Sequence, residues 1–311
     1  MNIVFVESLG MCECTINKSL ATLKNQGHTV TFYHDRNENE EVLIERARNA
    51  EVVVVSNIPL RKHFFENCPK LRMLSVAFTG VDHIDLEECK KRGITVCNAA
   101  GYSTEAVAEL TIGMMIAVYR KMVGGDAILR IGGDRQGVLG SELYGKTVGI
   151  VGLGAIGHAV AELAGAFGCE VAYHSVSGNK RAEKYPEMEL MELLKWADIL
   201  SIHSPLNERT RGLIGMAELR CMKPTAILVN VARGGIVDEQ ALADALDGGI
   251  LCGAVVDVFS QEPIPADNPL LKIKDPYRLL LSPHNAWSAQ ESIDNLVQAI
   301  VENIQTFLKA A

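Results

Sequence analysis

Residues 147–157 read Thr147-Val148-Gly149-Ile150-Val151 and then Gly152-Leu153-Gly154-Ala155-Ile156-Gly157. The first five residues form an apolar run typical of a buried strand, and the next six have the G-x-G-x-x-G spacing. A helix is expected to continue to Phe167 and to end at Gly168, and residues 170–174 predict the next strand. Strand, glycine turn, helix and strand in this order form the context in which this motif binds the pyrophosphate of a dinucleotide.

Each glycine has a separate task in such a turn. Gly152 permits the tight turn, Gly154 lets the backbone approach a pyrophosphate, and Gly157 lets helix and strand pack closely. Ala155 and Ile156 open the helix, where backbone amides and the positive end of the helix dipole favour phosphate. The alternative is a glycine-rich turn that binds no ligand.

The end of the following strand departs from the usual motif. An acidic residue about 20 positions on would bind the ribose of NAD, but residues 174–181 read His-Ser-Val-Ser-Gly-Asn-Lys-Arg. Small hydroxyls such as Ser175, followed by Lys180 and Arg181, suit a 2′-phosphate. The sequence therefore predicts an NAD(P) cofactor with NADP slightly favoured over NAD, unless the basic pair only faces solvent.

Working outward, apolar runs alternate with helix-like stretches along most of the chain, which predicts parallel sheets covered by helices. Strands are expected at 2–6, 29–33, 52–55, 72–77, 94–97, 147–151, 170–174, 198–202, 226–231, 252–257 and 278–281. A long apolar helix is expected from 104 to 122, then a loop-helix connection over 123–146, and a final amphipathic helix over 288–310.

Composition limits the possible functions. The 311 residues suit two domains, and a net charge of −8 argues against nucleic acid or an anionic membrane as partner. No apolar run approaches the roughly 18 residues of a spanning helix, and the N-terminus opens directly into a strand, so a cytoplasmic protein is expected. The eight scattered cysteines suit reduced thiols, and Cys12 and Cys14 are only half of a zinc site, so no metal is expected.

Three polar residues follow predicted strands of the second half: Arg233, Glu262 and His284. Open parallel sheets place their sites beyond the carboxyl ends of strands, so these side chains are expected to meet. Arginine can hold carboxylate and carbonyl oxygens together, and histidine exchanges protons near neutral pH. A neighbouring glutamate would orient the imidazole. The set suits hydride transfer to a 2-oxo acid, although each residue alone could be purely structural.

These stretches closely resemble the D-isomer-specific 2-hydroxyacid dehydrogenases. The resemblance covers nearly the whole chain and rests on residues 143–149 before the glycine turn, His203-Ser204-Pro205-Leu206, Asn230 to Gly235, Asp257-Val258-Phe259 with Glu262-Pro263, and Ser282-Pro283-His284 with Trp287.

The resemblance implies a role for each matching residue. Arg233 would bind substrate, and His284 with Glu262 would form the acid/base pair, His284 also contacting substrate. Thr79, Gly80 and Val81 would hold the substrate carboxylate. The cofactor would be contacted by Thr104, His203, Pro205, Val231, Ala232 and Asp257 in addition to the glycine turn.

The resemblance also implies an α/β fold of two doubly wound parallel-sheet domains. A Rossmann cofactor domain, residues 101–286, would be inserted into a flavodoxin-like substrate domain made by residues 1–100 and 287–311. A homodimer is implied as well. The expected reaction reduces a small 2-oxo acid to a D-2-hydroxy acid, with hydroxypyruvate or glyoxylate as candidates.

Two departures and two alternatives remain. The acidic ribose ligand is missing, and the segment 130–142 lacks the tryptophan that many relatives carry there. The same scaffold also resembles nucleotide-sensing corepressors, and it is shared by enzymes that oxidise formate or phosphite. A panel of 2-oxo acids and of those anions would distinguish the three classes.

Overall fold

A computed structural model of the chain describes residues 1–9, 20–178 and 184–310. The chain divides into two compact units. The first unit comprises Met1–Ser103 and Ser288–Ala311, and the second unit comprises Thr104–Trp287. The candidates Cys12, Cys14, Lys180 and Arg181 lie outside the described residues.

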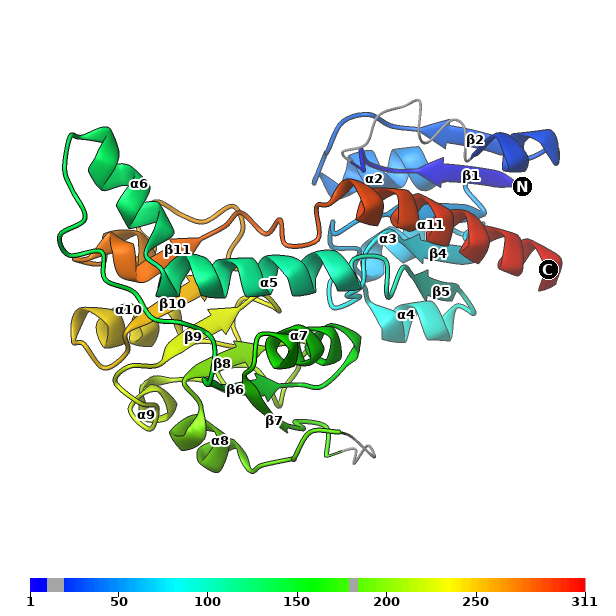
Figure 1. The fold of residues 1–311 in the computed structure, drawn as a ribbon. Coiled ribbons are helices and arrows are strands. Elements are labelled where there is room, and N and C mark those ends of the chain that lie inside the picture. The colour runs from blue at the N-terminus through cyan, green and yellow to red at the C-terminus, as the bar shows by residue number, and fades with distance from the viewer. Residues whose placement is uncertain (10–19, 179–183, 311) are drawn as a thin grey trace. The chain divides into compact units, whose positions relative to one another are not determined.

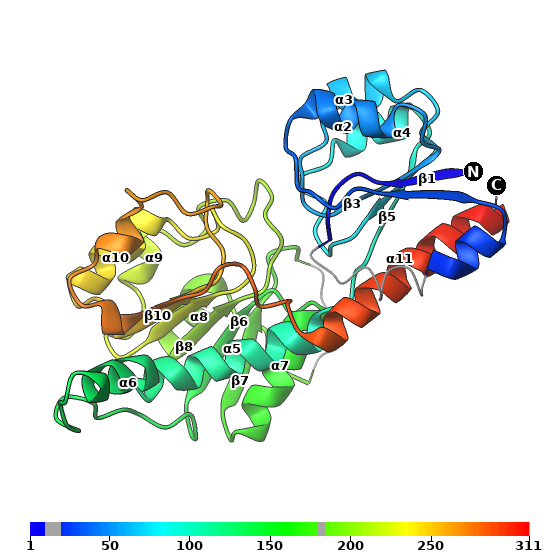
Figure 2. The same cartoon turned by 90° about the horizontal axis from the view of Figure 1, so that it is seen from above.

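The first unit is built on one parallel sheet with the strand order β2-β1-β3-β4-β5, the order of flavodoxin-like folds. Its elements are β1 (Asn2–Phe5), β2 (Thr29–Phe32), α2 (Glu40–Ala47), β3 (Val52–Val55), α3 (Lys62–Asn67), β4 (Met73–Val76), α4 (Leu86–Lys91), β5 (Thr95–Asn98) and α11 (Gln290–Ala310). Helices α2, α3 and α4 cover one face and α11 covers the other (Figures 1 and 2). Because both faces are covered, the central strands are continuous apolar runs such as Val52–Val55.

Helix α11 completes the first unit although it comes last in sequence. Leu296, Val297, Ile300 and Ile304 are its buried apolar residues, and the helix contacts β4 and β5. The predicted apolar stripe is confirmed. Burial of this stripe explains why the chain returns to its first sheet after completing the second unit.

The second unit contains a parallel sheet in the order β11-β10-β9-β8-β6-β7. Its elements are α5 (Thr104–Tyr119), α6 (Met122–Arg130), β6 (Thr147–Val151), α7 (Ala155–Ala166), β7 (Glu170–His174), α8 (Leu190–Trp196), β8 (Ile199–Ile202), α9 (Met216–Leu219), β9 (Ile227–Asn230), α10 (Glu239–Asp247), β10 (Gly253–Val256), η1 (Pro269–Lys272), η2 (Pro276–Arg278) and β11 (Leu279–Leu281). A parallel bridge from Tyr173 to Glu187 extends the sheet beyond β7, which gives the Rossmann order. The strand order reverses between β6 and β8.

Successive side chains along each strand of this sheet pack alternately into two hydrophobic cores. Ile199 belongs to the core shared with α5 and α7, whereas Leu200 belongs to the core shared with α8, α9 and α10. Ile227 and Leu228 divide in the same way. The period of two along each strand therefore places one helical layer on each face.

The predicted end of the helix over 104–122 is wrong. It stops at Tyr119, Lys121 adopts a left-handed backbone conformation with φ of 50°, and a second helix, α6, begins at Met122. Residues 123–146, expected as a loop-helix connection, therefore start within α6. The apolar composition did not reveal this break because no proline or glycine marks it.

The fold class is confirmed, and each predicted strand lies within one residue of an observed one at both ends. For the central strands the agreement follows from burial on both faces, which makes each of them a distinct apolar run. Among the described residues, none of the helices combines the length and the apolar character needed to cross a bilayer.

Candidate active site

The glycine turn joins β6 to α7 at the point where the strand order reverses. Gly152 has φ of 95°, and a Cβ there would lie 2.3 Å from Ser204 Oγ. A Cβ on Gly157 would lie 2.2 Å from Gly152 O. Both positions therefore require glycine. At Gly152 the positive φ and the close contact exclude a side chain, and at Gly157 the close contact alone does so.

Gly154 differs from the other two glycines. It is the N-cap of α7, and a Cβ there would meet no protein atom within 4 Å. Nothing in the protein's own packing among the described residues requires glycine at this position. The space beside it leaves the first amides of α7 open to an approaching group, which is what phosphate binding at a helix N-terminus needs.

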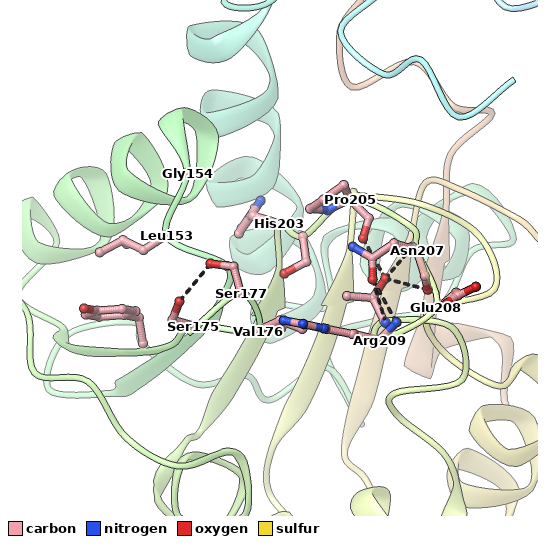
Figure 3. Close-up of a pocket in the computed structure, with 14 residues that line it drawn as sticks. Leu153, Gly154, Ser175, Val176, Ser177, His203, Pro205, Asn207, Glu208 and Arg209 are labelled. Atoms are coloured by element: carbon pink, nitrogen blue, oxygen red, sulfur yellow. Dashed lines mark hydrogen bonds between the residues drawn. The ribbon is translucent and has the colours of Figure 1, made fainter. Parts of the chain in front are cut away.

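Beside this turn lies a cavity of about 630 Å³ within the second unit (Figure 3). It is lined by Gly152, Leu153, Gly154, Tyr173, Ser175, Val176, Ser177, His203, Ser204, Pro205, Asn207, Glu208, Arg209 and Thr210. The lining comes from the ends of three neighbouring strands, β6, β7 and β8. A site at the carboxyl ends of strands, beside the reversal of strand order, is where open α/β sheets bind nucleotides.

The loop after β8 forms one wall of this cavity and is tightly hydrogen-bonded. Thr210 Oγ1 donates to Pro205 O at 2.7 Å, and Asn207 Oδ1 accepts from the amides of Arg209 and Thr210. His203 Nε2 lies 2.8 Å from Ser201 Oγ, and burial lowers the pKa of His203 to about 3. The imidazole is therefore neutral at physiological pH and lines the cavity without charge.

Among the residues that line this cavity, sequence reasoning selected Ser175 after β7 and His203 and Pro205 after β8. Asn207, Glu208 and Arg209 also line the cavity. Binding sites in such sheets lie beyond the carboxyl ends of the strands. Applying this rule to a few more residues after β8 would have found these three.

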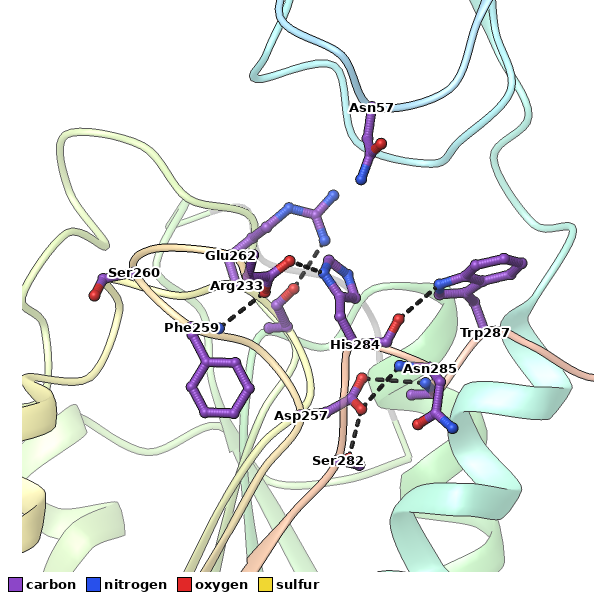
Figure 4. Close-up of polar contacts among 12 residues, drawn as sticks. Asn57, Arg233, Asp257, Phe259, Ser260, Glu262, Ser282, His284, Asn285 and Trp287 are labelled. Atoms are coloured by element: carbon purple, nitrogen blue, oxygen red, sulfur yellow. Dashed lines mark hydrogen bonds and ion pairs between the residues drawn. The ribbon is translucent and has the colours of Figure 1, made fainter. Parts of the chain in front are cut away.

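Arg233, Glu262 and His284 meet at the carboxyl ends of β9, β10 and β11 (Figure 4). His284 Nδ1 lies 2.7 Å from Glu262 Oε2, while Phe259 N donates to Glu262 Oε1 at 2.9 Å. Arg233 Nη1 donates to Ala232 O at 2.8 Å. In Figure 4 the guanidinium lies beside the Glu262–His284 pair.

The environment of Glu262 favours its ionised form. Burial acts to raise the pKa of Glu262, but hydrogen bonds from His284 and Phe259, with the charges of His284 and Arg233, hold it below its ordinary value. An ionised carboxylate on Nδ1 fixes the ring so that Nε2 is the nitrogen left for other chemistry. The imidazole side chain is 20 % exposed.

His284 is held by its backbone as well as by Glu262. It has φ of 51°, a conformation that few residues other than glycine adopt, and its amide donates to Asp257 O at 2.8 Å. Trp287 Nε1 donates to His284 O at 2.8 Å. Strain of this kind persists only where neighbouring contacts enforce it, and it is common at functional sites.

Asp257 organises the loop that carries His284. Its fully buried carboxylate accepts hydrogen bonds from Ser282 Oγ at 2.5 Å, Asn285 N at 3.0 Å and Ala286 N at 3.1 Å. The two backbone donors carry no sequence signal, because any residue supplies an amide. Asp257 thus shapes the loop around the histidine, in addition to the cofactor contact expected for it.

The sequence of this unit matches a known family. The model for the D-isomer specific 2-hydroxyacid dehydrogenase NAD-binding domain matches residues 112–286, more than half of the chain. The chain belongs to this family. It is an oxidoreductase of the kind represented by the glyoxylate reductases and glycerate dehydrogenases.

Relatives of this dehydrogenase match it over most of its length. The glyoxylate reductase of Korarchaeum cryptofilum is 39 % identical over 86 % of this chain and 83 % of its own. An acyclic imino acid reductase, Bsp5, in complex with NADPH and D-Arg has a TM-score of 0.91 at 31 % identity, covering 100 % of this chain and 98 % of its own. The D-lactate dehydrogenase of Aquifex aeolicus, with NAD and lactic acid, has a TM-score of 0.85 at 27 % identity, covering 100 % and 96 %.

In this dehydrogenase the loops bearing Arg233 and Glu262 are in direct backbone contact. A Cβ on Gly234 would lie 1.9 Å from Phe259 O and 2.5 Å from Ser260 N. Glu239, the first residue of α10, accepts from Ser260 N at 2.6 Å and from Asn268 Nδ2 at 2.6 Å. Sequence reasoning missed both contacts, which fix how the two functional loops lie relative to each other.

The remaining expected residues divide between the two units of the dehydrogenase. Val231 and Ala232 follow β9, and the Ala232 amide donates to Asn230 Oδ1 at 3.2 Å; Thr104 begins α5. Thr79, Gly80 and Val81 lie in the first unit, after β4. There Asn98 Nδ2 donates to Thr79 O at 2.7 Å and holds this loop against the end of β5.

Proposed function

We propose that this enzyme reduces small 2-oxo acids to D-2-hydroxy acids with NAD(P)H, and that glyoxylate and hydroxypyruvate are its first candidate substrates. The observation that carries the proposal is the ionised Glu262 on His284 Nδ1, beside Arg233, at the carboxyl edge of a family NAD-binding domain. We assign the cofactor domain to residues 101–286 and the substrate domain to residues 1–100 with 287–311, close to the two units described above.

The glycine turn fits a dinucleotide. The open space at Gly154 and the side-chain-free packing of Gly152 and Gly157 leave the amides of Ala155 and Ile156 available to a pyrophosphate. When bound, the nicotinamide supplies the hydride. Ser175, His203 and Pro205 would contact the adenosine half, since they line the adjoining cavity.

The chemical work of the protein is placement and proton transfer. Arg233 would bind the substrate carboxylate and polarise the carbonyl with its planar, always-charged fork. His284 would donate a proton from Nε2 to the carbonyl oxygen, because Nδ1 is held by Glu262. Glu262 stabilises the imidazolium before transfer and orients the ring after it.

Thr79, Gly80 and Val81 would add backbone amides for the substrate carboxylate. Asn98 Nδ2 donates to the Thr79 carbonyl, which restrains this loop before substrate arrives. Pre-organised donors stabilise a bound anion without the cost of ordering the loop at the moment of binding. In the second unit, Val231, Ala232, Asp257 and Thr104 are the remaining proposed cofactor contacts.

We propose a preference for NADPH. Residues 174–178, at and after the end of β7, offer hydroxyls but no carboxylate to bind the two ribose hydroxyls of NAD. Of the similar proteins above, the imino acid reductase was solved with NADPH and the D-lactate dehydrogenase with NAD. The proposal therefore depends on the chemistry at the end of β7 in this chain.

The test is a panel of glyoxylate, hydroxypyruvate and pyruvate with NADH and NADPH in parallel, extended to formate and phosphite for oxidation. Turnover of the 2-oxo acids is expected, and His284→Ala should lower kcat by about 10²–10⁴-fold while the cofactor Kd stays within twofold. Tight cofactor binding with no turnover would favour a nucleotide sensor instead. Oxidation of formate or phosphite alone would favour the third class.

We also propose that the enzyme is a homodimer assembled through α6 and the segment after it. Met122, Val123, Leu129, Ile131 and Leu139 are between 57 % and 89 % exposed there. Large apolar side chains gathered in this way are typical of a surface that a partner covers. Light scattering should give twice the chain mass, and Leu129→Glu with Ile131→Glu should give one chain mass.

A further inference from the structure

The adenosine-side cavity beside the glycine turn has an uneven distribution of charge. Of the fourteen described residues that line it, only Glu208 and Arg209 carry a full charge, because His203 is neutral. Both lie on the loop after β8, across from the hydroxyls of Ser175 and Ser177. Among the described lining residues Arg209 is the one cation, so the direction of its side chain decides where these residues can bind an anionic group.

Figure 3 shows the two charges pointing in different directions. The Arg209 side chain extends toward Val176 and the end of β7, whereas the Glu208 carboxylate points away from that end. The Ser175 and Ser177 hydroxyl oxygens are 3.4 Å apart and can donate to a common acceptor. Within the described parts of the chain, the Arg209 guanidinium forms no ion pair.

The backbone of Arg209 is fixed although its side chain is exposed. Its amide donates to Asn207 Oδ1 at 2.9 Å, and the adjoining Thr210 hydroxyl donates to Pro205 O. The position from which the guanidinium reaches across the cavity is therefore set by the loop itself. A charged fork on a fixed base is suited to binding a phosphate dianion.

We propose that Arg209, together with Ser175 and Ser177, binds the 2′-phosphate of NADP and sets the cofactor preference. The inference rests on the proposed function in taking NADP as the preferred cofactor. It assigns specificity to the loop after β8, on the opposite wall of the cavity from the strand end where the usual ribose ligand lies. Arginine offers the matching charge where an acidic residue would repel the phosphate.

The test compares binding of 2′,5′-ADP and 5′-AMP, which differ only in the 2′-phosphate, by calorimetry without any turnover. The wild type should bind 2′,5′-ADP more tightly. Arg209→Met should weaken 2′,5′-ADP by about tenfold or more, the size of a lost charge-assisted hydrogen bond, and should leave 5′-AMP within twofold. Arg209→Lys should retain part of the preference.

Arg211→Met is the matched control. It removes the same charge two residues away, at a position that does not line the cavity, and should leave both ligands unchanged. Equal weakening of both ligands in Arg209→Met would assign Arg209 to the adenine instead and overturn the proposal, as would no weakening at all. A wild type that does not distinguish the ligands overturns it too, yet leaves 2-oxo acid reduction with NADH standing.

Discussion

Replacing Gly234 by alanine tests whether backbone packing sets the geometry of the active site. The backbone of Gly234 lies outside the left-handed region, so alanine is compatible with its conformation. The new Cβ would nevertheless lie 1.9 Å from Phe259 O and 2.0 Å from Phe259 C. An ordinary contact is near 3.4 Å, so the loops of Arg233 and Glu262 must separate by about 1.5 Å.

This displacement predicts a large kinetic effect and a moderate loss of stability. Misplacement of catalytic groups by about 1 Å can cost roughly 100-fold in rate, so kcat/KM for the 2-oxo acid should fall by about that factor. Overpacking should lower the free energy of unfolding by about 1–3 kcal/mol. The Kd of the cofactor, measured by quenching of protein fluorescence, should change less than kcat/KM, because the glycine turn and the adenosine-side cavity lie on other strands.

Gly165→Ala is the control for adding a methyl group. Gly165 lies on α7 in the same unit, and a Cβ there meets nothing within 4 Å. This variant should keep full activity and gain up to about 1 kcal/mol of stability from helix propensity. If Gly234→Ala keeps kcat/KM within twofold of the wild type, the contact between the two loops does not control the catalytic geometry.

Three further predictions concern single side chains and their hydrogen bonds. Glu239→Ala, which releases Ser260 N, should lower kcat/KM at least about tenfold and stability by roughly 1.5–3 kcal/mol; unchanged kinetics would show that the Glu262 loop holds itself. Asn98→Ala should raise the KM for the 2-oxo acid but not for the cofactor, and an equal rise in both would contradict a role in the Thr79 loop. Burial acts to raise the pKa of Asp198, but hydrogen bonds from Thr147 and Lys223 hold it below its ordinary value. Its stabilising effect should be fully present above about pH 4, the unfolded pKa, and should be lost as the pH falls through the native pKa. The Tm difference between wild type and Asp198→Asn should therefore shrink in acid, and a constant difference would refute this linkage.

The strands and the glycine turn were predictable from sequence because their signals are local. Strands buried on both faces read as apolar runs, and Gly152 to Gly157 follow one of them directly. The grouping of Arg233, Glu262 and His284 was also predictable, since parallel strands bring their carboxyl ends to one edge. To predict that these three residues lie at this edge, it was enough to know that each follows a strand.

Other features depend on contacts between segments distant in sequence. The break between α5 and α6 carries no proline or glycine, so only the fold reveals that Lys121 turns the chain. The bond from Glu239 to Ser260 and the contact of Gly234 with Phe259 join separate loops, and no local pattern encodes them. Arg209 reads as an ordinary surface charge until the loop after β8 brings it opposite the end of β7.

The sequence by itself determined the positions of the strands along the chain, the dinucleotide turn and the three polar residues at strand ends. The tertiary structure decided which carboxylates hold the loops of those residues: Asp257 accepts from the Asn285 amide beside His284, and Glu239 accepts from the Ser260 amide near Glu262. The physical reason is that residue type specifies local conformation and burial. Hydrogen bonds to backbone amides depend only on where two chain segments meet.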